Sequence, residues 1–193
     1  MSTTKRLTEP SDTLLVFPSH LGWMAAVVAG GVVKQLTFGH PSAAAAKKAL
    51  GRKDLEPTKP GKRDARLVRR LQAYASGAPD SLCNVPVDLG PVGDFQRRVL
   101  ERCRRIPYGR TMSYGDLASK AGSARAARAV GNCMAANKIP LLVPCHRVVC
   151  SDGRLGSYSA PGGTATKRRL LAMESHEIGL ELGSDSGQNA AAL

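Results

Sequence analysis

The sequence contains few aromatic side chains, few acidic residues and no long apolar run. Aromatic residues make up 4% of the 193 positions, which argues against a protein that binds nucleic acid by stacking many bases. The longest uninterrupted apolar stretch, residues 21–33, spans 13 positions, which is too short to cross a bilayer as a helix. We therefore expect no transmembrane segment and no membrane partner.

The spacing and number of cysteines argue against a zinc-binding protein and against a secreted, disulfide-bonded one. No C-x-x-C pair is present, and no two histidines stand at zinc-finger spacing, so we expect no structural metal site. The five cysteines are odd in number and accompany no secretory signal, which favours reduced thiols. We therefore expect a cytoplasmic protein, or a nuclear one if the source is eukaryotic. The cysteines are Cys83, Cys103, Cys133, Cys145 and Cys150.

The first half of the chain has the pattern of a small α/β domain. Three short apolar segments separated by tight turns predict a three-stranded antiparallel sheet; they are residues 14–17, 23–28 and 32–38. Helical periodicity follows at residues 43–50 and 63–75. A stretch rich in proline and glycine then places a domain boundary near Gly90. We expect an N-terminal domain over residues 1–90.

The second half has a mainly helical pattern. Helices are predicted over residues 95–105, 113–121, 124–136 and 167–173, and residues 141–149 read as a buried extended segment. Ser113 and Asp116 have capping-box spacing, and Gly122 separates two short helices as in a helix-turn-helix. We expect a second domain over residues 91–177 and a disordered tail over residues 178–193.

Positive charge gathers around the helix-turn-helix pattern. The chain has 28 Lys and Arg against 15 Asp and Glu, for a net charge of +13. Residues 97–169 hold 15 basic residues against three acidic ones, and residues 47–70 hold ten against three. A basic helix face is often only a solvated surface. Its coincidence with a helix-turn-helix pattern favours DNA or RNA as the partner.

Cys145 is the candidate nucleophile because His146 and Arg147 follow it directly, and a basic neighbour lowers the pKa of a thiol. In a regular strand, neighbouring side chains point to opposite faces. Cys145 and His146 would then need a bend at Pro144 or a bridging water to act together. Glu174 is the only acidic residue between positions 153 and 176, so it is the candidate to orient the imidazole.

The competing interpretation is that Cys145 is an inert core residue, as most unpaired cysteines are. The other four cysteines keep that interpretation. A cysteine protease is a further alternative, but adjacent Cys and His are poorly placed for a direct dyad. A hydrolase would also leave the charge around the site unexplained.

The run from Ile139 to Val149, IPLLVPCHRVV, resembles the active-site motif of the O6-alkylguanine-DNA alkyltransferases (methylated-DNA–protein-cysteine methyltransferases). Residues 106–109 and 113–118 resemble the first part of that family's helix-turn-helix, and residues 126–131 resemble its recognition helix. The similarity covers roughly residues 93–175. The first half is similar only in outline, through residues 19–23 and the strand order.

The resemblance implies a fold and a DNA-binding mode. The fold would be a ribonuclease-H-like α/β domain followed by a mainly helical, winged-helix-like domain. Its helix-turn-helix would enter the minor groove of double-stranded DNA, with Ala126, Ala127 and Gly131 permitting close approach. Arg128 would fill the gap left by the flipped nucleotide, and Tyr114 would help to rotate that nucleotide and donate a proton toward the guanine ring.

The resemblance also implies the chemistry. Cys145 would accept the alkyl group of O6-alkylguanine, and of O4-alkylthymine, once per molecule and without cofactor or metal. His146 would take the thiol proton through a water, with Glu174 orienting His146 and Asn137 at the hinge. The guanine pocket would include Met134, Pro140, Val148, Tyr158 and Ser159. We expect a monomer and leave cooperative binding on DNA open.

Three departures and two alternatives qualify this prediction. Ala160 replaces a glycine common in relatives and Pro161 lies in a longer loop that would border the pocket, so the accepted alkyl size stays open. Lys138 stands where relatives often have proline or another residue. A non-catalytic, alkyltransferase-like damage-binding protein is the first alternative, but those relatives lack the acceptor cysteine. A sequence-specific regulator would need polar base-reading residues over 124–136, where this chain has mainly alanine, glycine and arginine.

Overall fold

The first half of the chain forms a three-stranded antiparallel sheet. The computed structural model describes residues 11–175, and the sheet has the order β1 (Thr13–Phe17), β2 (Trp23–Ala29), β3 (Val32–His40). Gly30 and Gly31 make the β2–β3 turn with φ of 56° and 82°, a conformation that glycine adopts without strain. The strands and their antiparallel pairing confirm the sequence prediction.

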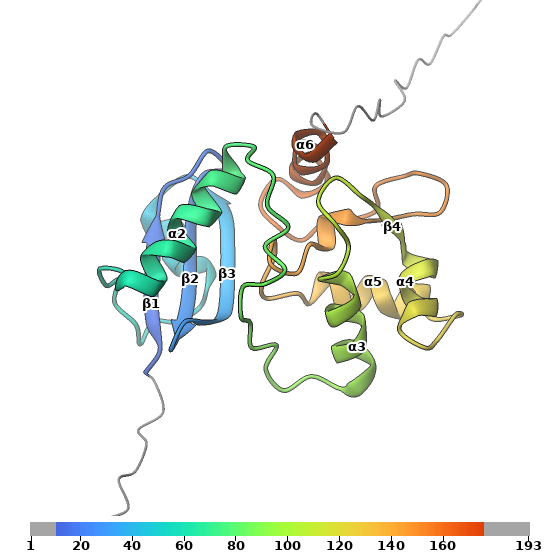
Figure 1. Ribbon diagram of the computed structural model, residues 1–193, viewed down its shortest axis with the longest axis horizontal. Helices are drawn as coiled ribbons and strands as arrows, with labels where there is room; N and C mark the ends of the chain where they lie inside the picture. Colours follow the sequence, from blue (N-terminus) through green and yellow to red (C-terminus); the bar gives the residue numbers. More distant parts are fainter. Residues whose placement is uncertain (1–10, 176–193) are drawn as a thin grey trace, which may run out of the picture.

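One helix covers each face of this sheet. The side chains of Leu14, Ala25 and Val27 pack against α1 (Ala43–Ala49). Alternate residues along the same strands point to the opposite face, where α2 (Lys62–Ala75) buries its apolar stripe. Figure 1 shows α2 lying across the sheet. Its apolar residues thereby join the core that continues into the second half.

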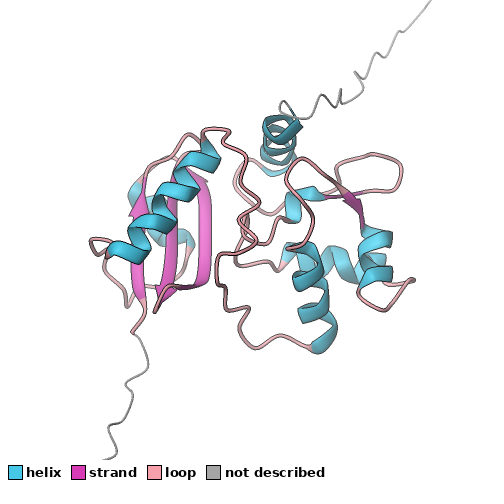
Figure 2. Cartoon of the chain, in the orientation of Figure 1, coloured by secondary structure: helices cyan, strands magenta, loops and turns pink. Residues whose placement is uncertain are grey.

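The second half is built from short helices and long loops (Figure 2). Its elements are α3 (Asp94–Cys103), β4 (Met112–Ser113), α4 (Tyr114–Lys120), α5 (Ala127–Ala135), the 3-10 helix η1 (Cys145–Arg147), β5 (Val148–Val149) and α6 (Gly163–Ser175). The Ser113 hydroxyl accepts a hydrogen bond from the Asp116 amide at 3.0 Å, as the capping pattern predicts. Helices α4 and α5 follow one another through a turn in which Gly122 has φ of 84°.

The predicted extended segment over residues 141–149 is wrong. Cys145–Arg147 form a turn of 3-10 helix, in which the Arg147 amide donates to the Pro144 carbonyl at 2.9 Å. Only Val148–Val149 are extended, and they pair with β4 in parallel. A short apolar run reports burial but does not distinguish a strand from another buried backbone. Helix α5 also begins at Ala127 rather than 124, and α6 begins earlier, at Gly163.

A single apolar core joins the two halves. It includes Phe38 and Tyr74 from the first half and Leu117 and Leu170 from the second. The Leu36 amide of β3 also donates to the Lys138 carbonyl at 2.9 Å. The boundary predicted at residue 90 lies in the connection between α2 and α3, and the predicted tail over residues 178–193 lies outside the described residues. Within residues 11–175, none of the helices has the length and apolar character needed to cross a membrane.

Candidate active site

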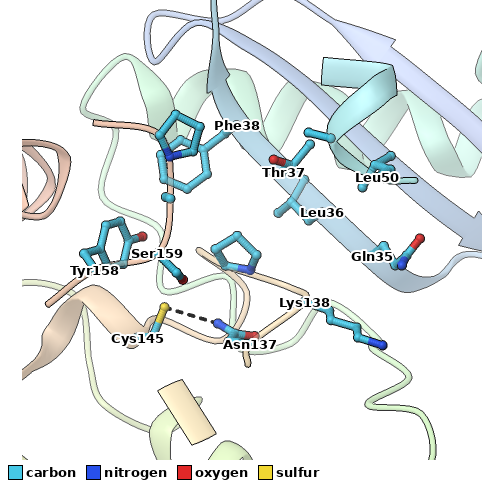
Figure 3. A pocket seen from close by; sticks show the side chains of 14 residues that line it. Gln35, Leu36, Thr37, Phe38, Leu50, Asn137, Lys138, Cys145, Tyr158 and Ser159 are labelled. Carbon is cyan, nitrogen blue, oxygen red and sulfur yellow. Dashed lines mark hydrogen bonds between the residues drawn. The ribbon is translucent and has the colours of Figure 1, made fainter. Parts of the chain in front are cut away.

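The Cys145 thiol lies at the start of η1, buried at 3% exposure. The Asn137 side chain fixes the turn that carries it. Its amide nitrogen donates to Cys145 Sγ at 3.2 Å and to the Val143 carbonyl at 2.9 Å, and its oxygen accepts from the Ile139 amide at 3.0 Å. Figure 3 shows Asn137 pointing at the sulfur. The structure thus brings together Asn137 and Cys145, two of the predicted site residues.

The Nε2 side of the His146 ring contacts α6. Its Nε2 lies 3.0 Å from Glu174 Oε1, and an ionised carboxylate only accepts hydrogen bonds, so we assign the ring proton to Nε2. The Nδ1 lone pair is then available, and this buried atom has no hydrogen-bond partner among residues 11–175. Burial lowers the pKa of His146 below its usual range, against the influence of Glu174. The ring is therefore neutral, with Nδ1 as its basic atom.

Glu174, near the end of α6, is buried at 0% exposure and is surrounded by donors. Arg147 donates to it through Nη2 at 2.7 Å and Nε at 2.9 Å, and the Gly109 amide donates at 3.1 Å. Burial alone would raise the pKa of Glu174, but the hydrogen bonds from His146 and Arg147, together with the charge of Arg147, outweigh it and hold that pKa far below its ordinary value. The carboxylate is therefore ionised, as an orienting group for His146 requires.

Three further buried residues were missed by sequence reasoning. Arg147 is fully buried and also donates to the Ile106 carbonyl at 2.8 Å; its place in the motif was visible, but its partner was not. The Tyr74 hydroxyl donates to Glu174 Oε1 at 2.5 Å from α2, and no sequence signal connects α2 to this site. Lys167 is buried and donates to the carbonyls of Val148 and Leu155, although a lysine on a helix normally predicts solvent.

The thiol is protonated in its resting environment. Burial raises the pKa of Cys145, and this effect outweighs the lowering influence of the Asn137 hydrogen bond and of the Lys167 charge. Among the described residues, no hydrogen bond joins Cys145 to His146. This absence agrees with the sequence argument that adjacent residues are poorly placed for a direct dyad. Attack by this sulfur therefore requires a base that removes its proton. The next residue, His146, has an Nδ1 atom with no hydrogen-bond partner among the described residues.

Two hollows meet at Cys145. One, of about 200 Å³, lies beside α4 and α5. The other, of about 190 Å³, lies between the second half and β3 (Figure 3). Both hollows are lined by Cys145, Tyr158 and Ser159. The first is also lined by Tyr114, Gly131 and Met134, and the second by Asn137 and Pro140. The fully buried Val148 lines neither hollow, and its carbonyl accepts from Lys167.

The residues predicted to meet DNA lie on or beside the short helices. Ala126 precedes α5, Ala127 begins it, and Arg128 is exposed on it. A Cβ added to Gly131 would meet no atom within 4 Å, so this part of α5 is open. Tyr114 begins α4 and its ring lies against Gly156, where an added Cβ would come within 3.0 Å of the hydroxyl. Of these residues, Tyr114 and Gly131 line the hollow beside α4 and α5.

The fold and site combine a buried cysteine thiol, a hydrogen-bonded His–Glu pair and two short consecutive helices. Comparison with known proteins agrees. A family described as 6-O-methylguanine DNA methyltransferase, DNA binding domain, matches residues 94–176. The human methylated-DNA–protein-cysteine methyltransferase is 48% identical over 101 residues, which cover 51% of this chain and 48% of the human protein. The Mycobacterium leprae protein of that name is 41% identical over 115 residues, covering 59% of this chain and 67% of the relative.

Solved structures extend the similarity into the first half. The Mycobacterium tuberculosis OGT, crystallised in complex with DNA, has a TM-score of 0.69 and 34% identity, covering 85% of this chain and 93% of that one. The O6-methylguanine-DNA methyltransferase of Pyrococcus kodakaraensis has a TM-score of 0.59 and 25% identity, covering 85% and 99%. The chain belongs to the methylated-DNA–protein-cysteine methyltransferase family. The aligned region nevertheless spans only about half of the human relative.

Proposed function

We propose that this protein repairs DNA by transferring the alkyl group of O6-alkylguanine to its own Cys145, once per molecule. The observation that carries the proposal is the buried Cys145 thiol at the meeting of two hollows, next in sequence to an imidazole with a free Nδ1. O4-alkylthymine is a second substrate because it presents the same alkyl–oxygen bond.

The DNA partner follows from the position of the site. The target carbon is shielded inside a duplex, so the nucleotide must leave the stack to reach a buried sulfur. Ala126, just before α5, and Ala127 and Gly131 within it are the small residues that face the minor groove, and the exposed Arg128 takes the place of the extruded nucleotide. The hollow lined by Tyr114 and Met134 then receives the guanine.

The transfer step uses only groups of this chain, water and the substrate. A water passes the thiol proton from Cys145 to His146 Nδ1, and Glu174 stabilises the resulting imidazolium. The sulfur electron pair attacks the alkyl carbon, an S–C bond forms, and the C–O bond breaks with its electrons moving to guanine O6. Tyr114 gives a proton to the guanine ring, and the proton held by His146 returns through water to the Tyr114 oxygen, so that the unalkylated guanine remains in the DNA. The alkyl donor is the DNA itself, so no cofactor and no metal is required.

The remaining features belong to the same proposal. The first half would be a ribonuclease-H-like scaffold and the second a winged-helix-like DNA-binding unit. We propose a monomer that acts in the cytoplasm, or in the nucleus of a eukaryote. The thioether product is not cleaved by ordinary thiol chemistry, so each molecule is consumed by one lesion.

The test is an intact-mass measurement after incubation with duplex DNA containing O6-methylguanine, followed by peptide mapping. We expect one added methyl group on the peptide that contains Cys145 and no second turnover. The Cys145→Ala variant should bind the same DNA and gain no mass. Tight binding by the wild-type protein without a mass change would overturn the proposal and favour the damage-binding alternative.

A further inference from the structure

Helix α2 lies in the half of the molecule that does not carry the thiol, yet the side chain of its Tyr74 contacts His146 and Glu174. We propose that Tyr74 is a positioning residue for the His146–Glu174 pair, which keeps the imidazole in the neutral form with its proton on Nε2. This inference rests on the proposed function and adds a residue of the first half to it.

The geometry of the Tyr74 hydroxyl supports two simultaneous hydrogen bonds. The hydroxyl donates to Glu174 Oε1 at 2.5 Å and lies 3.3 Å from His146 Nε2. Because its proton is directed to the carboxylate, its oxygen lone pair can accept from the Nε2–H group. The phenol thus contacts both members of the pair. Its ring is fully buried and packs edge-on against Tyr108, with centroids 6.1 Å apart.

The carboxylate oxygen that faces His146 accepts from three residues. Glu174 Oε1 accepts from Tyr74 at 2.5 Å, from Arg147 Nη2 at 2.7 Å and Nε at 3.2 Å, and from His146 Nε2 at 3.0 Å. Each donor other than His146 draws negative charge away from the imidazole. A carboxylate without these donors would stabilise the imidazolium more strongly and raise the proton affinity of His146.

The protonation state of His146 decides whether it can act as a base. In the imidazolium form both ring nitrogens carry protons, and Nδ1 can no longer accept one. The charged and titratable groups facing the ring are Tyr74 from α2, Arg147 from η1, and Glu174 and Lys167 from α6. Burial raises the pKa of Tyr74 well above its ordinary value, so the phenol remains a hydrogen-bond donor throughout the neutral pH range.

The experiment compares Tyr74→Phe with Tyr108→Phe as the matched control. Both changes remove one hydroxyl from neighbouring rings, but the Tyr108 hydroxyl donates to the carbonyls of Gly77 and Met173. The measured quantity is the first-order rate of methyl transfer at saturating duplex, as a function of pH. For Tyr74→Phe we expect the acidic limb of the pH–rate profile to shift to higher pH by on the order of one unit. At a given pH below the limb, the transfer rate should be about tenfold slower than in the wild type. The rate above the limb should match the wild type.

A purely structural role predicts a different result. Loss of packing would lower the rate by the same factor at every pH, or shift the limb equally in Tyr108→Phe, and either outcome would overturn the proposal. Titration of the His146 ring by 15N NMR gives a second measurement that needs no transfer. A His146 pKa that is unchanged in folded Tyr74→Phe would reject the role of Tyr74, whereas absence of transfer by the wild-type protein rejects the proposed function instead.

Discussion

At the residue scale, the Arg147–Glu174 pair is the strongest buried ionic contact of the site. Both side chains are 0% exposed and lie 2.7 Å apart at their closest. Taking two charges out of water is costly, and the pair is tolerated because almost every donor and acceptor finds a partner. Its stability contribution therefore depends on both members being present, and removal of either leaves an uncompensated buried charge.

We predict that Glu174→Gln lowers the free energy of unfolding by about 3–5 kcal/mol, because Arg147 stays charged inside the core. Urea unfolding followed by circular dichroism measures the change. Asp152→Asn is the control, since its partner Arg154 is 82% exposed and exposed pairs contribute little. Equal, small effects of the two substitutions would show that Arg147 finds another partner.

The same variant predicts a change in acid sensitivity. The pKa of Glu174 is held below its ordinary value in the folded protein, so the unfolded state binds its proton first as the pH falls. The stabilisation is complete above the ordinary pKa of glutamate, about 4.3, and is lost progressively at lower pH. We expect the unfolding free energy of the wild type to fall more steeply below that pH than that of Glu174→Gln. Parallel curves would contradict this assignment.

At the scale of elements, the sequence was sufficient to predict secondary structure where the periodicity and capping signals were local. The three strands, the Ser113 cap and the order of the helices follow from patterns within a few residues. The backbone around Cys145 did not follow, because Leu141, with φ of 69°, and the 3-10 turn are set by contacts with Asn137. The sequence reasoning that paired His146 with Glu174 agrees with their 3.0 Å contact, whereas Tyr74 could not be found, since only the packing of α2 brings it there.

Helix α5 carries a prediction of its own. Gly131 has open space where a side chain would begin, and leucine favours a helix interior by up to about 1 kcal/mol over glycine. We expect Gly131→Leu to leave the melting temperature unchanged or raise it, and to weaken binding to duplex DNA at least about tenfold by blocking close approach. Ala73→Leu, at an exposed position of α2, is the matched control. Undiminished binding, measured by fluorescence anisotropy, would remove α5 from the DNA contact.

At the scale of the whole molecule, one apolar core links the sheet to the second half of the chain. Tyr74 and Phe38 share an apolar cluster with Leu117 and Leu170, and Arg104 Nη2 donates across to the Val85 carbonyl at 2.7 Å. Neither half therefore closes its own apolar surface. We therefore predict that the two regions expected as separate domains unfold together.

This continuity predicts a single unfolding transition. Trp23, the one tryptophan of the chain, lies in β2 and reports on the first half, whereas helix content by circular dichroism reports mostly on the second. We expect urea curves from the two probes to coincide, as two-state unfolding requires. Transitions with separate midpoints would show that the halves unfold independently.

The Tyr74 contact also bears on how such genes can be shuffled. The family model matches residues 94–176, yet Tyr74, whose hydroxyl donates to Glu174, is encoded upstream of that region. A recombinant that inherits its two halves from different ancestors would keep every recognisable motif and still separate Glu174 from the tyrosine that accompanies it. Recombination between related genes should therefore be retained more often when it exchanges the whole coding region than when it exchanges the thiol-bearing half alone.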